Sequence, residues 1–214
     1  PHLLKGMLSI SGWTMVQSFI SVSIWFIFFL AIEHLGERPL AVTNIVRNIS
    51  ALLIMVISAF ATTAGALISN QIGAGEQRCL FKTCGMTLKL TYAILIPLLI
   101  ILCLFPEPVL RAFTDSPSLI AASVNSVYVM ASSTLIMAPS FILFNAVSGT
   151  GNTKAGFIME MISLAVYTAV IYYGIIRLKP DVALCWFSEH VYGVTLIFLA
   201  WWYLKSGKWR GKKV

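Results

Sequence analysis

The chain has 214 residues, of which 58% are hydrophobic and only 11% are charged, whereas a soluble domain is usually about a quarter charged. This composition is typical of a membrane protein and argues against a soluble globular domain. The net charge of +7 comes from basic residues in short segments between apolar blocks, not from one basic stripe with interleaved aromatic residues. We therefore expect no nucleic-acid partner.

The apolar residues occur in long blocks along the chain. A helix needs about 20 mostly apolar residues to cross the roughly 30 Å hydrocarbon layer, and 8–32, 48–75 and 116–153 contain no Asp, Glu, Lys, Arg or His. Segments with Gly or Pro separate the blocks. We predict an all-α integral membrane fold, a bundle of six transmembrane helices near 8–32, 40–70, 80–105, 118–148, 155–177 and 183–204.

The lysines and arginines of the connecting segments predict the orientation, because cytoplasmic loops retain positive charge. One side carries nine of them and the other four: Lys5, Arg78, Lys82, Lys154, Lys205, Lys208, Arg210, Lys212 and Lys213 against Arg38, Arg111, Arg177 and Lys179. We expect a multi-pass protein of the cell (inner) membrane with both ends of the chain, including a basic tail over 205–214, in the cytoplasm. Since the chain opens at Pro1 with no initiator Met or signal peptide, we expect it to be part of a longer protein.

Polar side chains inside the predicted spans are candidates for a substrate cavity, because unpartnered polar groups are costly in hydrocarbon. In the first span, hydroxyl residues at spacings of three and four form a polar stripe, which fits either helix packing or a cavity wall. In the second span, Arg47 lies deep enough to need a partner, water or a path to the outer surface. The candidate cavity residues are Gln17, Ser21, Asn44, Arg47, Asn48 and Asn145.

Two acidic residues of the later spans are candidates for proton coupling. Glu160 lies six residues beyond Lys154 and has apolar helix on both sides. Burial disfavours the charged form of a carboxyl group, so such a group can exchange protons near physiological pH. The alternative is that Glu160 pairs with a basic group of a cytoplasmic loop. Glu189 lies at a similar depth from the other side, in a span whose start is less well defined.

No catalytic site or metal site is expected from the sequence. The four cysteines form no CxxC pair, and the three histidines are isolated at span ends. No nucleophile, base and orienting group can be assembled from these motifs. We therefore expect neither an enzyme nor a resident cofactor or metal, and the ions involved would be the protons or sodium ions whose gradient drives transport.

Three segments next to the predicted spans carry a family resemblance. They are Leu67-Ile-Ser-Asn-Gln-Ile-Gly-Ala-Gly-Glu76, Ala112-Phe-Thr-Asp115 and Ala146-Val-Ser-Gly-Thr-Gly-Asn-Thr153. Together with span count and loop order, they resemble the carboxyl-terminal half of the multidrug and toxic compound extrusion (MATE) family. The resemblance implies one six-helix lobe of a twelve-helix efflux transporter, with pseudo-twofold symmetry between the lobes, an amino-terminal six-helix lobe as partner, and a substrate cavity between them.

The sequence departs from one subclass of that family at two places. That subclass has a glutamate for cation coupling in its seventh helix, where this chain has Val16 or Gln17, and an acid in its tenth helix, near 137–140, where this chain has none. The chain resembles instead the subclass whose coupling aspartate is in the first helix. Within this half, Glu160 is then the remaining candidate.

The resemblance implies secondary active efflux of cationic or amphiphilic compounds, that is, multidrug antiport, with membrane lipid around the protein and small cationic molecules as substrates. Two alternatives remain open. A flippase for lipid-linked saccharides would place many basic residues in the cavity, because its cargo carries phosphate. A non-transporting membrane assembly subunit would have packed polar stripes and no water-filled cavity.

Overall fold

The computed structural model describes the backbone of residues 2–207 and 209, and within that part the side chains of all residues except 2–11, 13, 14 and 17. Every regular element in the described part is a helix, which confirms the all-helical class. The elements are α1 (His2–Glu33), α2 (Glu37–Gly73), η1 (Gln77–Cys79), α3 (Leu80–Leu104), α4 (Pro106–Arg111), α5 (Pro117–Gly149), α6 (Thr153–Val170), η2 (Ile171–Arg177), α7 (Val182–Cys185) and α8 (Phe187–Ser206).

Five helical segments of the described chain are long and apolar enough to cross a bilayer. They are Glu37–Gly73, Gln77–Leu104, Pro117–Gly149, Thr153–Arg177 and Val182–Ser206. The first predicted span lies in α1, a helix of 32 residues from His2 to Glu33, whose part with described side chains includes the apolar stretch Ser18–Glu33. These helices support a multi-pass membrane protein, whereas six spans and a symmetry between lobes stay predictions.

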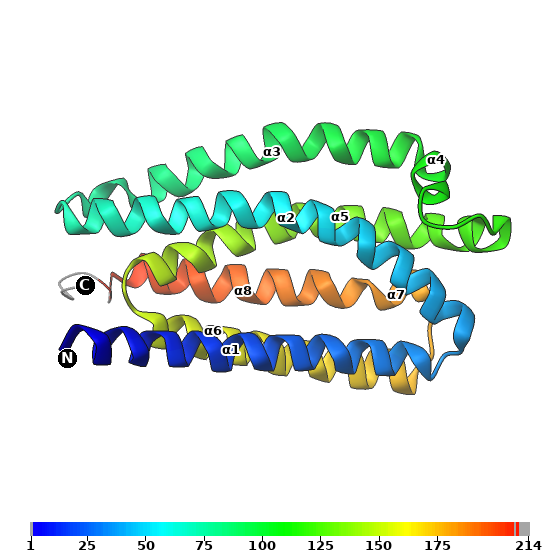
Figure 1. The fold of residues 1–214 in the computed structure, drawn as a ribbon, viewed down its shortest axis with the longest axis horizontal. Coiled ribbons are helices and arrows are strands. Elements are labelled where there is room, and N and C mark those ends of the chain that lie inside the picture. Colours follow the sequence, from blue (N-terminus) through cyan, green and yellow to red (C-terminus); the bar gives the residue numbers. More distant parts are fainter. Residues whose placement is uncertain (1, 208, 210–214) are drawn as a thin grey trace.

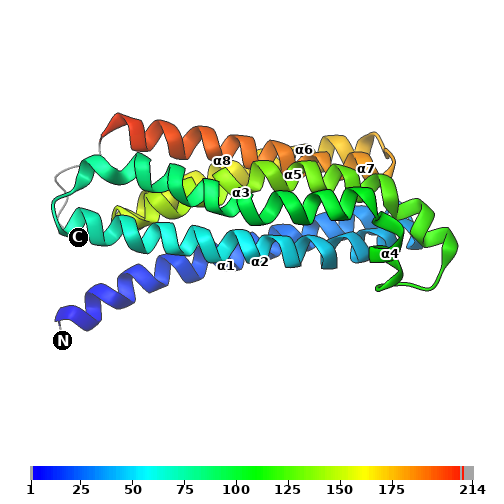
Figure 2. The same cartoon turned by 90° about the horizontal axis from the view of Figure 1, so that it is seen from above.

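The long helices run side by side as one elongated bundle (Figure 1). The start of α1, the α2–α3 and α5–α6 connections and the end of α8 lie at one end, and the α1–α2 connection, α4 and α7 lie at the other (Figure 1). The first part of α1 leans away from the bundle (Figure 2), whereas α1 as a whole contacts mainly α6 and α2. We name the end with the start of α1 the basic end, because the described side chains of Arg78, Lys82, Lys154 and Lys205 belong to it.

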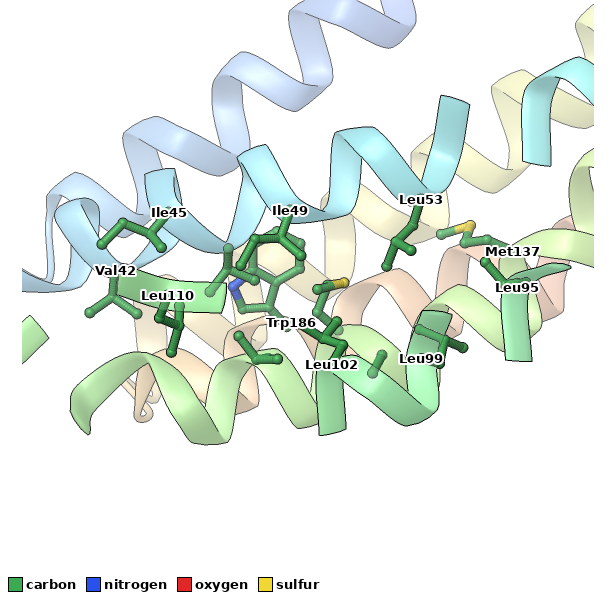
Figure 3. Packing of buried hydrophobic residues seen from close by; sticks show 14 of the residues in the cluster. Val42, Ile45, Ile49, Leu53, Leu95, Leu99, Leu102, Leu110, Met137 and Trp186 are labelled. Carbon is green, nitrogen blue, oxygen red and sulfur yellow. The ribbon is translucent and has the colours of Figure 1, made fainter. Parts of the chain in front are cut away.

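The apolar core of the other end is built on one face of α2. Buried side chains recur along this helix every three or four residues, which places them in one stripe. Figure 3 shows this stripe facing α3, α4 and α5. The labelled residues are Val42, Ile45, Ile49 and Leu53 of α2, Leu95, Leu99 and Leu102 of α3, Leu110 of α4, Met137 of α5, and Trp186. All are at most 7% exposed, so this core fixes α2 against α5 in the half of the bundle nearer α4.

Toward the basic end, two glycines bring α2 and α5 into backbone contact. A Cβ atom added at Gly149 would lie 2.5 Å from the carbonyl oxygen of Gly65, and one added at Gly65 would lie 2.9 Å from the carbonyl oxygen of Asn145. Small residues allow membrane helices to approach this closely without a hydrophobic driving force between them. Gly65 and Gly149 therefore set the spacing of the two longest helices of the bundle.

Two predicted spans are less regular than expected. The helix that begins at Thr153 continues from Ile171 to Arg177 with the wider π-helical spacing, and such wide turns often occur at functional sites. The helix expected over 183–204 is interrupted at Trp186, so that Glu189 lies in the first turn of α8. These irregularities depend on tertiary packing, which the hydropathy pattern does not report.

Candidate functional site

A cavity of about 210 Å³ lies within the bundle between α1, α2, α5, α6 and α8. Its lining combines apolar and aromatic side chains with two carboxyl groups and one serine hydroxyl. The lining residues are Ser21 and Trp25 of α1, Ile54 of α2, Met137 and Phe141 of α5, Glu160, Leu164 and Tyr167 of α6, and Glu189 and Tyr192 of α8. The cavity therefore joins five helices around the buried acids of the chain.

Glu160 is buried, with 5% of its surface exposed, and two neutral hydroxyl groups hold its carboxyl. The Ser21 hydroxyl donates to Oε1 over 3.0 Å, and the Tyr192 hydroxyl lies 3.0 Å from Oε1 and 3.1 Å from Oε2. These donors come from α1 and α8, so Glu160 connects three helices. In the described part of the chain its partners include no basic group, so the structure does not show the loop ion pair that the sequence left open.

Glu189 is held in a similar way by another tyrosine. It is 6% exposed, and the hydroxyl of Tyr167 donates to its Oε1 over 2.8 Å. Tyr167 is itself 2% exposed and comes from the same helix as Glu160. Among the described residues, the hydrogen bond from Tyr167 reaches Oε1 of this carboxyl.

The two acids and the two tyrosines form a reciprocal arrangement between α6 and α8. Each helix supplies one acid and one tyrosine, and each tyrosine donates to the acid of the other helix. The rings of Tyr167 and Tyr192 meet edge to face, with centroids 5.8 Å apart and planes inclined at 70°. The carboxyl groups are thus linked by contiguous side chains inside the bundle. In low-dielectric surroundings, a pair of acids like this can bind a proton or another cation.

The structure brings three of the predicted site residues together, whereas four others do not line this cavity. Ser21, Glu160 and Glu189 line it. The Arg47 guanidinium lies 5.1 Å above the Phe29 ring on an exposed part of α2. Of the remaining candidates, Asn48 is exposed and Asn44 is half-buried. The side-chain amide of Asn145 donates a hydrogen bond to the Phe141 carbonyl. The side chain of Gln17 lies outside the described residues.

Sequence reasoning missed the aromatic residues of the site. Tyr167, Tyr192, Trp25 and Phe141 line the cavity but resemble the many other aromatic residues of an apolar membrane chain. A weak signal was present: each buried acid has a tyrosine three or seven residues further along its own helix, a spacing that places acid and tyrosine on similar faces. That spacing cannot show that the tyrosines bond across the helices.

No group of three or more His, Cys, Asp or Glu side chains that could hold a metal ion occurs among the described residues. The two carboxyl groups of the cavity are thus its only acidic groups within that part of the structure. This donor set is too small for the several oxygen ligands that divalent magnesium or calcium requires.

The family model called MatE matches residues 14–173. This chain belongs to the MatE family. Its members are membrane transporters and not enzymes, and the match covers α2 to α6 and most of α1, including Ser21 and Glu160. The search of curated protein sequences found no match to the chain.

Several solved MATE structures share the fold. A bent form of VcmN, the MATE transporter of Vibrio cholerae, is 16% identical with a TM-score of 0.86, over 97% of this chain and 48% of that protein. An outward-facing multidrug resistance MATE family transporter of the MOP superfamily is 14% identical with a TM-score of 0.83, over 95% and 46%. A MOP superfamily transporter of Pyrococcus furiosus is 14% identical with a TM-score of 0.81, over 93% and 44%. At these identities the likeness shows the fold, and the MatE chain described here spans less than half of each structure.

Proposed function

We propose that this chain is the carboxyl-terminal lobe of a secondary transporter that exports cationic or amphiphilic compounds in exchange for protons or sodium ions. The observation that carries the proposal is the cavity with two buried acids, Glu160 and Glu189, in a chain of a transporter family. Acids inside a membrane protein are costly and are usually kept for a function such as ion coupling or recognition of a cation. The basic end of the bundle would face the cytoplasm of a cell whose inner membrane holds the protein.

Glu160 is the side chain best placed to couple transport to protons. Its carboxyl can hold a proton, while the hydroxyls of Ser21 and Tyr192 are positioned to donate to the charged form when the proton leaves. Because these donors belong to α1 and α8, a change in the proton content of Glu160 alters the contacts between three helices. A movement of α1, whose first part leans away from the bundle, would then follow protonation (Figure 2).

The lining of the cavity favours a cationic cargo over the phosphate-bearing cargo of a flippase. A phosphate group is recognised by arginine, lysine or backbone amides, whereas the described lining has two acids and no basic side chain. The presence of a cavity among the polar residues likewise argues against a purely structural assembly subunit.

Efflux of ethidium from proteoliposomes that contain the full-length protein tests this function, with a proton gradient and a sodium gradient imposed separately. Efflux driven by either gradient would support the antiporter and would identify the ion. Absence of efflux with both gradients would contradict it and would favour the flippase or the assembly subunit.

A further inference from the structure

A second hollow, of about 350 Å³, runs between α2 and α3 toward the basic end of the bundle and shares no lining residue with the acid-lined cavity. Its wall includes Phe60, Leu67 and Gln71 of α2 and Lys82, Met86 and Leu90 of α3. We propose that this groove, which we name the α2–α3 groove, binds an anionic phospholipid of the leaflet at the basic end. One acyl chain lies in the groove, and Lys82 holds the phosphate.

The length of the groove matches one leaflet of a bilayer. Its lining covers residues 60–71 of α2 and 79–90 of η1 and α3, and each stretch spans about 16 Å at a helical rise of about 1.5 Å per residue. The hydrocarbon layer is about 30 Å thick, so the acyl region of one leaflet measures about half of that. The groove therefore extends over the depth that one acyl chain occupies.

The polarity of the groove changes along its length in the same order as that of a phospholipid. Gln71, Lys82 and Thr83 lie at the end nearer the α2–α3 connection, where the Thr83 hydroxyl donates to Oε1 of Gln71 over 2.9 Å and links the two helices. Phe60 and Leu90 lie at the deeper end. A headgroup fits the first end and a hydrocarbon chain fits the second.

The charges around the groove select an anionic headgroup. The described lining contains Lys82 and no acid, and Glu76 of the adjoining loop does not line it. Arg78, four residues before Lys82, is exposed at the same end. Basic residues at the membrane surface attract anionic lipids, and lysine binds phosphate as a point charge. A zwitterionic headgroup would gain less from this surrounding.

Lys89 provides a separate reason to expect a phosphate at this place. It is exposed on α3 and lies seven residues after Lys82, which puts it near the same face and about 10 Å deeper. A lysine in lipid is costly unless its amine reaches the interface. Side chains lean toward the start of their helix, and α3 starts at the basic end, so Lys89 extends toward the proposed phosphate.

The outer face of α3 indicates that acyl chains cover this part of the molecule. Figure 1 shows α3 at the edge of the bundle, where it packs mainly against α2 and α5. Large apolar side chains are exposed along the whole helix, among them Phe81, Ile94, Ile100, Ile101 and Leu104. A continuous apolar surface of this kind in a membrane protein is in contact with lipid. The groove opens on the same surface, since Met86 and Leu90 are more than half-exposed.

Native mass spectrometry of the full-length protein released from detergent micelles tests the proposal. The probes are phosphatidylglycerol and phosphatidylethanolamine with identical acyl chains, added at equal concentrations. We expect phosphatidylglycerol to bind at least about threefold more tightly, because the basic groups favour a net negative headgroup. Equal binding of the two lipids would overturn the proposal.

Two further results of the same experiment separate a lipid from other occupants. Excess glycerophosphoglycerol, which is the headgroup without acyl chains, should not displace phosphatidylglycerol, because the groove contacts the chain. Displacement would assign the basic groups to a soluble phosphate and overturn the lipid site. A dimer that retains neither lipid would show that a second copy of the chain covers this face, and would also overturn it.

Variants locate the headgroup and the chain. Lys82→Gln should reduce the preference for phosphatidylglycerol by about threefold or more, and Lys82→Arg should retain it. Its control is Lys154→Gln, an exposed lysine at the same end and outside the groove. Met86→Trp should fill the groove and weaken both lipids by about threefold or more, whereas Ile101→Trp, on an exposed site further along α3, should not. Groove variants that bind lipid as their controls do would contradict the site.

Acetylation of the wild-type protein provides a test that does not depend on the folding of a variant. Phosphatidylglycerol should slow the acetylation of Lys82 by about threefold or more relative to phosphatidylethanolamine, while Lys154 reacts equally in both. Equal rates at Lys82 would overturn the site. None of these measurements requires transport, so this inference and the proposed export function stand or fall separately.

Discussion

The hydroxyl of Tyr192 on α8 donates to the carboxyl of Glu160 on α6, at 3.0 Å from one oxygen and 3.1 Å from the other. Tyr167, seven residues after Glu160 on α6, donates in turn to the carboxyl of Glu189 on α8. The acids that we assign to transport chemistry are therefore also the groups that fasten α6 to α8. A change in the charge of either acid therefore alters the contacts between the two helices.

Tyr192→Phe should lower the free energy of unfolding by about 1 kcal/mol, because the part-buried hydrogen bond to Glu160 is removed while Ser21 still donates to Glu160. Denaturant unfolding of the full-length protein in mixed micelles measures the change. Tyr128→Phe is the control, because Tyr128 is 43% exposed. Equal unfolding curves for both variants would show that the bond contributes nothing.

Tyr167→Phe should cost more than Tyr192→Phe, about 1–3 kcal/mol, because it leaves Glu189 without its described donor in a buried place. The double variant Tyr167→Phe/Glu189→Gln tests the cause. If the bond is formed, the two changes are not additive, and the interaction energy lies at about 0.5 kcal/mol or more. Strict additivity would contradict the direct contact.

Gly149→Ala should destabilise the protein by more than about 1 kcal/mol, since a methyl group there overlaps the backbone of Gly65. The measurement is again denaturant unfolding. Gly156→Ala is the matched control, because a Cβ at Gly156 lies 3.6 Å or more from its neighbours. This substitution should be neutral or stabilising, since alanine is favoured over glycine within a helix. A Gly149→Ala protein as stable as the control would refute the close approach of α2 and α5.

A membrane-impermeant maleimide should modify Cys79 from the cytoplasmic side only. Cys79 is half-exposed at the basic end, whereas Cys84 and Cys185 are buried, and the basic end is the one that the positive-inside rule places in the cytoplasm. The experiment compares inside-out with right-side-out vesicles, using a full-length protein whose other cysteines are replaced by serine. Labelling in right-side-out vesicles alone would reverse the orientation, and Cys79→Ser gives the background.

The helical membrane fold was predictable because hydropathy is a local property. Long apolar blocks without charge form helices in lipid, because every backbone polar group there must be bonded internally. Gly151, with its positive φ of 76°, lies in one of the turns between these helices. The interruption at Trp186 and the π-helical stretch from Ile171 were not predicted, because both arise where helices pack against one another.

The candidate site was predictable only in part, for the same reason. An acid within apolar helix, such as Glu160, stands out in a sequence because burying it is costly. Its partners come from 139 and 32 residues away along the chain, and no spacing rule reports such distances. Arg47 stood out for the same reason as Glu160, yet the structure places it beside Phe29, away from the cavity.

Proton-driven ethidium efflux in proteoliposomes, measured side by side for wild type, Glu160→Gln and Glu107→Gln at equal protein content, tests most directly whether the buried acid takes part in transport. Glutamine keeps the size of the side chain but cannot carry a proton, and Glu107 is an exposed acid outside the cavity. We predict that Glu160→Gln lowers the gradient-driven rate by about tenfold or more, whereas Glu107→Gln leaves it unchanged. Equal rates for all three proteins across the pH range would remove Glu160 from the mechanism.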